Sequence, residues 1–159
     1  MTGSPYFKYA MVELLIEDLI WTPLLITIIL VVVLAFSFRT VLGVITPLLT
    51  VGIGVILTLG SIAALGYSLS MISVLVPPLL MILGFSYSVH VTSEYHLQRI
   101  KPDSKDTVIL QTLKHMTLPV ILTGLTTIAG FVALMANPIS AVKEFGVFAA
   151  IGVVYITVL

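Results

Sequence analysis

The feature that most constrains this chain is the length of its segments that contain no ionisable residue. Four segments lack Asp, Glu, Lys, Arg and His: residues 19–38, 40–89, 116–142 and 145–159. A helix needs about 20 apolar residues to cross a hydrocarbon core about 30 Å thick. The second segment would extend roughly 75 Å as a helix, which is enough for two crossings with a turn at residues 66–70. The other three fit one crossing each, so we expect five membrane spans.

The predicted fold is an all-α, polytopic transmembrane helix bundle. An extracytoplasmic end with an interfacial helix occupies residues 1–19, and this helix is expected to bend into the first span at Thr22 and Pro23. A cytoplasmic amphipathic segment, residues 96–116, joins the third and fourth spans. The bundle itself covers residues 20–159, with spans at 20–38, 41–65, 71–95, 117–136 and a truncated 144–159.

The distribution of Lys and Arg predicts the orientation, because these residues collect in cytoplasmic loops. If the N-terminus is outside, Lys8 and Lys143 are external and five cations are internal. The internal cations are Arg39, Arg99, Lys101, Lys105 and Lys114. No signal peptide precedes the first span and the last span is short, so we expect the chain to be an internal piece of a longer protein.

Composition excludes several classes of protein. Charged residues make up 9% of the chain, against about 25% in soluble domains. The net charge is zero, without a basic cluster that could follow nucleic-acid phosphates. With no cysteine and no hydrolase, zinc-protease or phosphate-loop motif, we expect neither an enzyme nor a cofactor. His90 and Glu94, with His96 nearby, are too few ligands to predict a metal site.

Two successive prolines, Pro77 and Pro78, stand inside the expected third span. They remove two backbone donors and push Val76 away from helical angles. Interrupted helices near the middle of a membrane are typical of transport sites. A simple kink used for packing is the alternative interpretation, and both stay open at this point.

Beyond the prolines, one helical stripe carries Ser86, His90 and Glu94, with Tyr87 beside it. Ionisable groups inside a membrane usually face other helices and mark proton relays or substrate paths. For Glu94 we favour the alternative that it reaches interfacial water. For His90 both interpretations remain open.

The fourth span is unusually polar, with Thr123, Thr126 and Thr127 in succession. Their hydroxyls can bond to their own helix, which we favour, or to a neighbour. If this span packs against the third, Thr126 and Thr127 would meet Ser86 and Tyr87. Small residues in the second span favour close helix packing over a narrow path; they are Gly43, Gly52, Gly54, Gly60, Ser61, Ala64 and Gly66.

Several of these motifs occur together, in order, in one known family. Residues 66–71, the Pro77–Pro78 pair and the run from Gly84 to His90 resemble the helix with the Gly-x-Asp-Tyr motif in RND-superfamily exporters of the MMPL type. Residues 118–131 and 143–146 resemble the next two helices. The opening Thr-Gly-Ser-Pro resembles the end of a large extracytoplasmic domain.

The resemblance implies that the chain holds helices two to six of one sterol-sensing-domain-like repeat of six helices. It implies export of lipids or other hydrophobic molecules from the cytoplasmic (inner) membrane, driven by protons. The implied partners are membrane lipids or hydrophobic small molecules and the remaining repeat of the same transporter; an oligomer stays open. A lipid-sensing or scaffold module without transport is the alternative.

Ser86 stands where the family carries its proton-binding Asp, and serine cannot titrate. Coupling could therefore reside in the other repeat, His90 could substitute, or this subfamily could work without protons. We favour the first. The residues expected to line the coupling or substrate pathway are Ser86, Tyr87, His90, Thr126 and Thr127, with the helix break at Pro77 and Pro78.

Overall fold

The structure is a computed structural model that describes residues 4–67, 72–99 and 105–159, with side chains described for all of these except residues 4–11 and 15. This part of the chain contains helices and no strand, which confirms the predicted all-α fold. The helices are α1 (Ser4–Phe38), α2 (Val41–Ala64), α3 (Val76–Gln98), α4 (Lys105–Ala133) and α5 (Ser140–Val158). Two short 3₁₀ turns, η1 (Ser73–Leu75) and η2 (Leu134–Ala136), complete the set.

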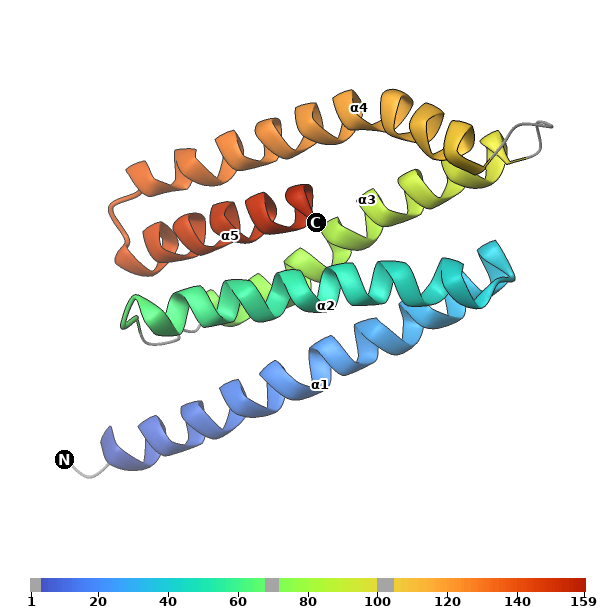
Figure 1. Ribbon diagram of the computed structural model, residues 1–159. Helices are drawn as coiled ribbons and strands as arrows, with labels where there is room; N and C mark the ends of the chain where they lie inside the picture. Colours follow the sequence, from blue (N-terminus) through green and yellow to red (C-terminus); the bar gives the residue numbers. More distant parts are fainter. Residues whose placement is uncertain (1–3, 68–71, 100–104) are drawn as a thin grey trace.

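Five helices of the described chain are long and apolar enough to cross a membrane, as the sequence predicts. Figure 1 shows α1 and α4 at opposite edges of the bundle, with α2, α3 and α5 between them. In the most apolar stretch of α1 and of α4, 6% of the residues are buried, against 44% in α3 and 39% in α5. Helices α3 and α5 are therefore the centre of the bundle.

Helix α1 runs without interruption through Pro23, so the segment expected at the interface and the first span belong to one helix, and the bend at Thr22 and Pro23 stays a prediction. Its 35 residues extend over roughly 53 Å, well beyond the hydrocarbon core. A proline at this position frees the carbonyl of Leu19, which neighbours Glu17 and Asp18. These two acids belong at the membrane surface, where water can satisfy the freed carbonyl.

The amphipathic segment predicted at residues 96–116 is likewise not a separate element. Helix α3 extends to Gln98, and α4 begins at Lys105 and continues past Pro119 into the fourth span. The amphipathic residues are thus the first turns of a long helix that continues into the fourth span. Residues 100–104, which join the two helices, lie outside the described residues.

The predicted helix break at Pro77 and Pro78 is also corrected. Both prolines lie in the first turn of α3, which follows directly from η1, and Val76 keeps helical angles with φ −61° and ψ −51°. Amide groups in the first turn of a helix have no partner inside that helix. The prolines therefore begin α3 rather than interrupt it, and they remove no hydrogen bond from its interior.

Helix α2 ends in a turn at Gly66, where φ is +72°. The amide of Gly66 donates to the carbonyl of Ala63, and the amide of Tyr67 donates to that of Ile62. Glycine adopts this left-handed backbone without steric cost, which explains the turn that the sequence predicts here. The rest of the predicted turn, residues 68–70, lies outside the described residues.

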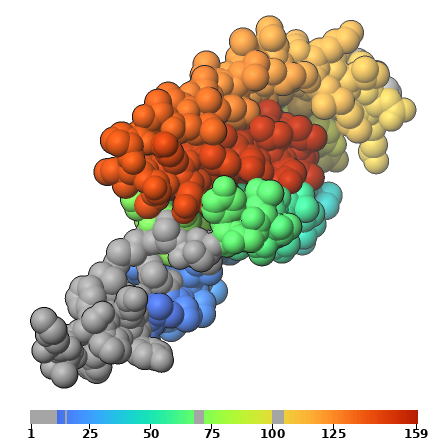
Figure 2. All heavy atoms as spheres, turned by 90° about the vertical axis from the view of Figure 1, so that its left-hand side faces the viewer, coloured from blue at the N-terminus to red at the C-terminus, as the bar shows by residue number. Residues whose placement is uncertain are grey.

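The main core lies where α5 packs against α2 and α3. Its buried side chains are Ile62, Val76, Leu80, Tyr87, Phe148, Val153 and Ile156. A second cluster joins α1 to α2 and α3 through Leu34, Val51, Met81 and Phe85. Viewed from one end, α2, α4 and α5 form a continuous mass (Figure 2).

Glycines allow α5 to approach its neighbours closely. A Cβ atom placed on Gly54 of α2 or on Gly84 of α3 would lie 2.7 Å or 3.1 Å from side-chain atoms of Ile156. On α5 itself, a Cβ on Gly146 would lie 2.6 Å from the backbone oxygen of Phe131. The predicted packing role thus applies to Gly54, whereas Gly60 of the same helix has no such neighbour within 4 Å.

We expect Gly146→Ala to destabilise the bundle by about 1–3 kcal/mol, because the added methyl group meets backbone that cannot move aside without shifting α5 from α4. The measurement is thermal unfolding in detergent. Gly60→Ala is the matched control and should be neutral or slightly stabilising, since alanine favours helix more than glycine does. Equal losses in both variants would contradict the close approach of α5.

Candidate functional site

The α3 stripe predicted from the sequence lies beside α4. Ser86, Tyr87 and His90 line a cavity of about 270 Å³ together with residues of α4. The α4 residues are Met116, Pro119, Val120 and Thr123. Because α3 is wedged between all the other long helices, it holds this stripe in a fixed position.

Tyr87 is the most enclosed residue of the stripe, with 8% of its surface exposed. Its ring belongs to the main core, and it also borders a second cavity of about 390 Å³, which His90 does not line. Among the described side chains, its hydroxyl is a buried polar atom without a hydrogen-bond partner. A buried hydroxyl left in this state costs about 1–3 kcal/mol, so Tyr87 is poised to bond to a group that enters either cavity.

Ser86 and His90 are exposed in the described chain. Helices α1 and α4 both pack on α3, but within the described residues they do not touch each other. The polar stripe of α3 therefore lies open between them. It combines a hydroxyl and an imidazole on a surface otherwise dominated by aliphatic side chains.

The structure does not bring Thr126 and Thr127 to this stripe. The Thr126 hydroxyl donates to the carbonyl oxygens of Leu122 (3.1 Å) and Thr123 (2.9 Å), and that of Thr127 donates to Thr123 (2.7 Å). It is Thr123, one turn earlier, that lines the cavity with Ser86 and His90. Both hydroxyls therefore bond to their own helix, which is the interpretation favoured from the sequence.

A polar cluster that the sequence does not predict joins the far end of α3 to α4. The amide nitrogen of buried Gln98 donates to the Glu94 carboxylate at 2.7 Å. His115 Nδ1 lies 3.0 Å from the same carboxylate oxygen and 3.3 Å from the Gln98 nitrogen. Glu94 thus bonds to protein groups, which the sequence does not predict, and its expected contact with interfacial water stays a prediction.

A second link, between α2 and α5, joins the hydroxyls of Ser61 and Tyr155 at 2.9 Å. Hydroxyl pairs of this kind stabilise helix contacts in lipid, where no water competes for them. In the part of the chain that the structure describes, no group of three or more His, Cys, Asp or Glu side chains could hold a metal ion. The site is therefore built from hydroxyl groups, one imidazole and aliphatic walls.

Comparison with known proteins places this arrangement in a family. A model of the MMPL family matches residues 1–159. A predicted membrane protein of Methanocaldococcus jannaschii is 32% identical over 152 residues, which cover 96% of this chain and 39% of that relative. The chain thus spans about two fifths of the length of this relative. No solved structure matches significantly. Proteins of the MMPL family are membrane transporters rather than enzymes, and this multi-pass membrane chain belongs to that family.

Proposed function

We propose that the chain is part of an RND/MMPL-type exporter of lipids or other hydrophobic substrates, in which it supplies helices two to six of one repeat. Family membership supports a transporter-related role. The observation that carries the finer proposal is the open polar stripe of α3. Polar and ionisable side chains inside a membrane usually mark a pathway.

The remaining repeat of the same transporter is the partner that we propose for this stripe. Ser86 and His90 lie in the middle of α3 and are exposed between α1 and α4. Polar side chains at this depth are costly to leave in lipid, so a protein surface with complementary polar groups should cover them. The pathway would then run between the two repeats, with Tyr87 and Thr123 on its wall.

Proton coupling is proposed to reside outside this chain. Ser86 occupies the position of the family Asp and cannot carry a proton, whereas an acid in the other repeat could face it across the pathway. His90 is the second candidate, because an imidazole can gain and lose a proton and this one borders the same cavity as Ser86 and Tyr87. A lipid-sensing module without transport is less favoured, since the family consists of transporters.

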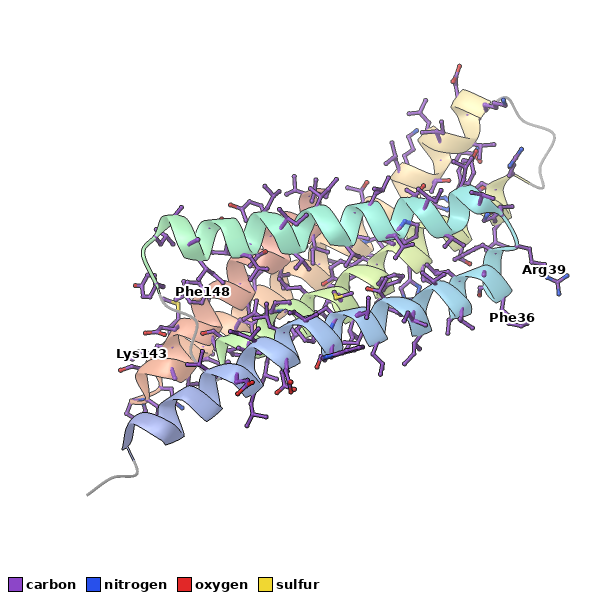
Figure 3. The ribbon with its side chains drawn as sticks, turned by 90° about the horizontal axis from the view of Figure 1, so that it is seen from below. Phe36, Arg39, Lys143 and Phe148 are labelled. Carbon is purple, nitrogen blue, oxygen red and sulfur yellow. The ribbon has the colours of Figure 1, made fainter. Side chains whose placement is uncertain are left out.

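The proposed location is the cytoplasmic membrane, with the N-terminal end of α1 outside. Arg39 and Lys143 lie at opposite ends of the bundle (Figure 3). The end with Arg39 also carries Arg99 and Lys105, since α3 ends and α4 begins there. The positive-inside rule then makes this end cytoplasmic.

We expect Tyr87→Phe and His90→Gln to slow transport by about tenfold each, the loss that corresponds to one buried hydrogen bond worth about 1.4 kcal/mol. The measurement is movement of a fluorescent phospholipid across vesicles that contain the full-length protein under an imposed pH gradient. Thr27→Val is the matched control, because its hydroxyl bonds to the Pro23 carbonyl on α1, away from the stripe. Its rate should not change.

Two further measurements in the same vesicles separate the coupling alternatives. A protonophore should stop transport by the unaltered protein. If His90 carries the proton, His90→Gln should also flatten the dependence of the rate on pH, whereas coupling in the other repeat leaves the shape of that curve intact. Transport that is insensitive to the protonophore would reject proton coupling altogether.

The orientation predicts which introduced cysteines react from outside the cell. The chain has no cysteine of its own, so single replacements report one position each. Tyr67→Cys and Asn137→Cys should react with an impermeant maleimide on intact cells. Arg39→Cys and Lys105→Cys should react only after permeabilisation. If the two positions of either pair reacted from different sides of the membrane, the five-span arrangement would be contradicted.

A further inference from the structure

A groove at the end of the bundle that carries Arg39 and Arg99, here called the basic end, adjoins the pathway described above at Tyr87 and extends away from it. A cavity of about 610 Å³ lies there between α2, α3 and α4, and Arg99, His96 and Tyr95 line its α3 side. It shares Thr92 and Leu113, among others, with the cavity of about 390 Å³ that reaches Tyr87. The two cavities therefore form one continuous groove.

The groove has the depth of about one membrane leaflet. Arg99 at its mouth and Tyr87 at its inner end are twelve residues apart on α3, which corresponds to about 18 Å. The hydrocarbon core is about 30 Å thick, so one leaflet is about 15 Å deep. Ile156 of α5 closes the inner end of the groove.

The groove also opens sideways toward lipid. Helices α2 and α4 have no contact with each other within the described residues, and α3 forms the floor between them. Ile109 and Leu113 on the α4 wall are 47% and 55% exposed. A molecule in the surrounding membrane can therefore enter the groove laterally, without crossing the bilayer.

The walls of the groove carry a positive charge at the mouth and hydroxyl and apolar groups farther in, as the headgroup, ester groups and acyl chains of a phospholipid would require. Arg99 provides a permanent positive charge at the mouth, and no Asp or Glu is among the described residues that line the groove. The nearby Glu94 is instead bonded to Gln98. About 10 Å deeper, at Thr92, hydroxyl groups begin to line the groove. Its inner part combines hydroxyl-bearing and aliphatic side chains, and most of the surface that they present is apolar.

We propose that this groove binds one anionic phospholipid of the bilayer. Its phosphate would pair with Arg99, its ester groups would lie near Thr92, and an acyl chain would follow Leu113 toward Ile156. Basic pockets between membrane helices on the cytoplasmic side are suited to such headgroups. This inference concerns a lipid bound to the bundle and does not depend on which molecule is transported.

The test uses the full-length protein in vesicles that contain a trace of phospholipid with a photoreactive diazirine in its acyl chain. One sample carries phosphatidylglycerol and the other phosphatidylcholine, and mass spectrometry locates the labelled residues after illumination. We expect phosphatidylglycerol to label residues 91–98 and 109–117 about fivefold more than phosphatidylcholine does, the factor expected for one cation near a membrane surface.

Two variants and one internal reference make the outcome decisive. Arg99→Gln should remove the headgroup preference, while Arg39→Gln, at the same end but outside the groove, should keep it. Exposed Ile28 and Ile29 of α1 should be labelled equally by both lipids in every variant, which controls for the amount of each photoreactive lipid in the membrane. Equal labelling of the groove by both headgroups would overturn the proposal. An unlabelled groove would also overturn it, because another segment of polypeptide would then fill the site.

Discussion

The structure depends on the close approach of α5 to α2, α3 and α4. Inside a bilayer, lipid tails are as apolar as leucine, so the hydrophobic effect does not hold one membrane helix against another. Dispersion contacts between closely packed atoms and a few polar links replace it. Gly54 and Gly84 admit Ile156, Gly146 lies against the Phe131 carbonyl, and Ser61 bonds to Tyr155. These contacts hold α3 against α5 and α2, and they thereby set the position of the polar stripe on α3.

The sequence predicts the number and type of elements well, because ionisable residues are excluded from the hydrocarbon core and mark the limits of each span. It predicts the ends of the helices less well. Hydropathy records where the apolar run ends, whereas α1 and α4 continue as helices beyond that run. The Pro77–Pro78 pair shows the same limit, since a proline pair predicts either a broken helix or the start of one.

At the site, helical periodicity predicts correctly that Ser86 and His90 share a face, because this is a property of one helix. It does not predict which residue of α4 faces them. That register depends on how far α3 and α4 slide along each other, and the structure selects Thr123 rather than Thr126 or Thr127. For the same reason, no local pattern reveals that His115 meets Glu94, 21 residues away.

Disulfide formation between α2 and α5 tests the packing of α5 most directly, since the chain contains no competing cysteine. A Cβ atom on Gly54 lies 2.7 Å from Ile156 Cγ1. Because Ile156 Cβ is one bond of about 1.5 Å from Cγ1, the two Cβ atoms lie at most about 4.2 Å apart, which is compatible with the separation of about 3.5–4.5 Å found in disulfides. The double variant Gly54→Cys/Ile156→Cys should form an internal disulfide under mild oxidation, seen as two proteolytic fragments that separate only after reduction. Gly52→Cys/Ile156→Cys should not, because nothing lies within 4 Å of Gly52. Failure of the first pair, or equal cross-linking of both, would contradict the account.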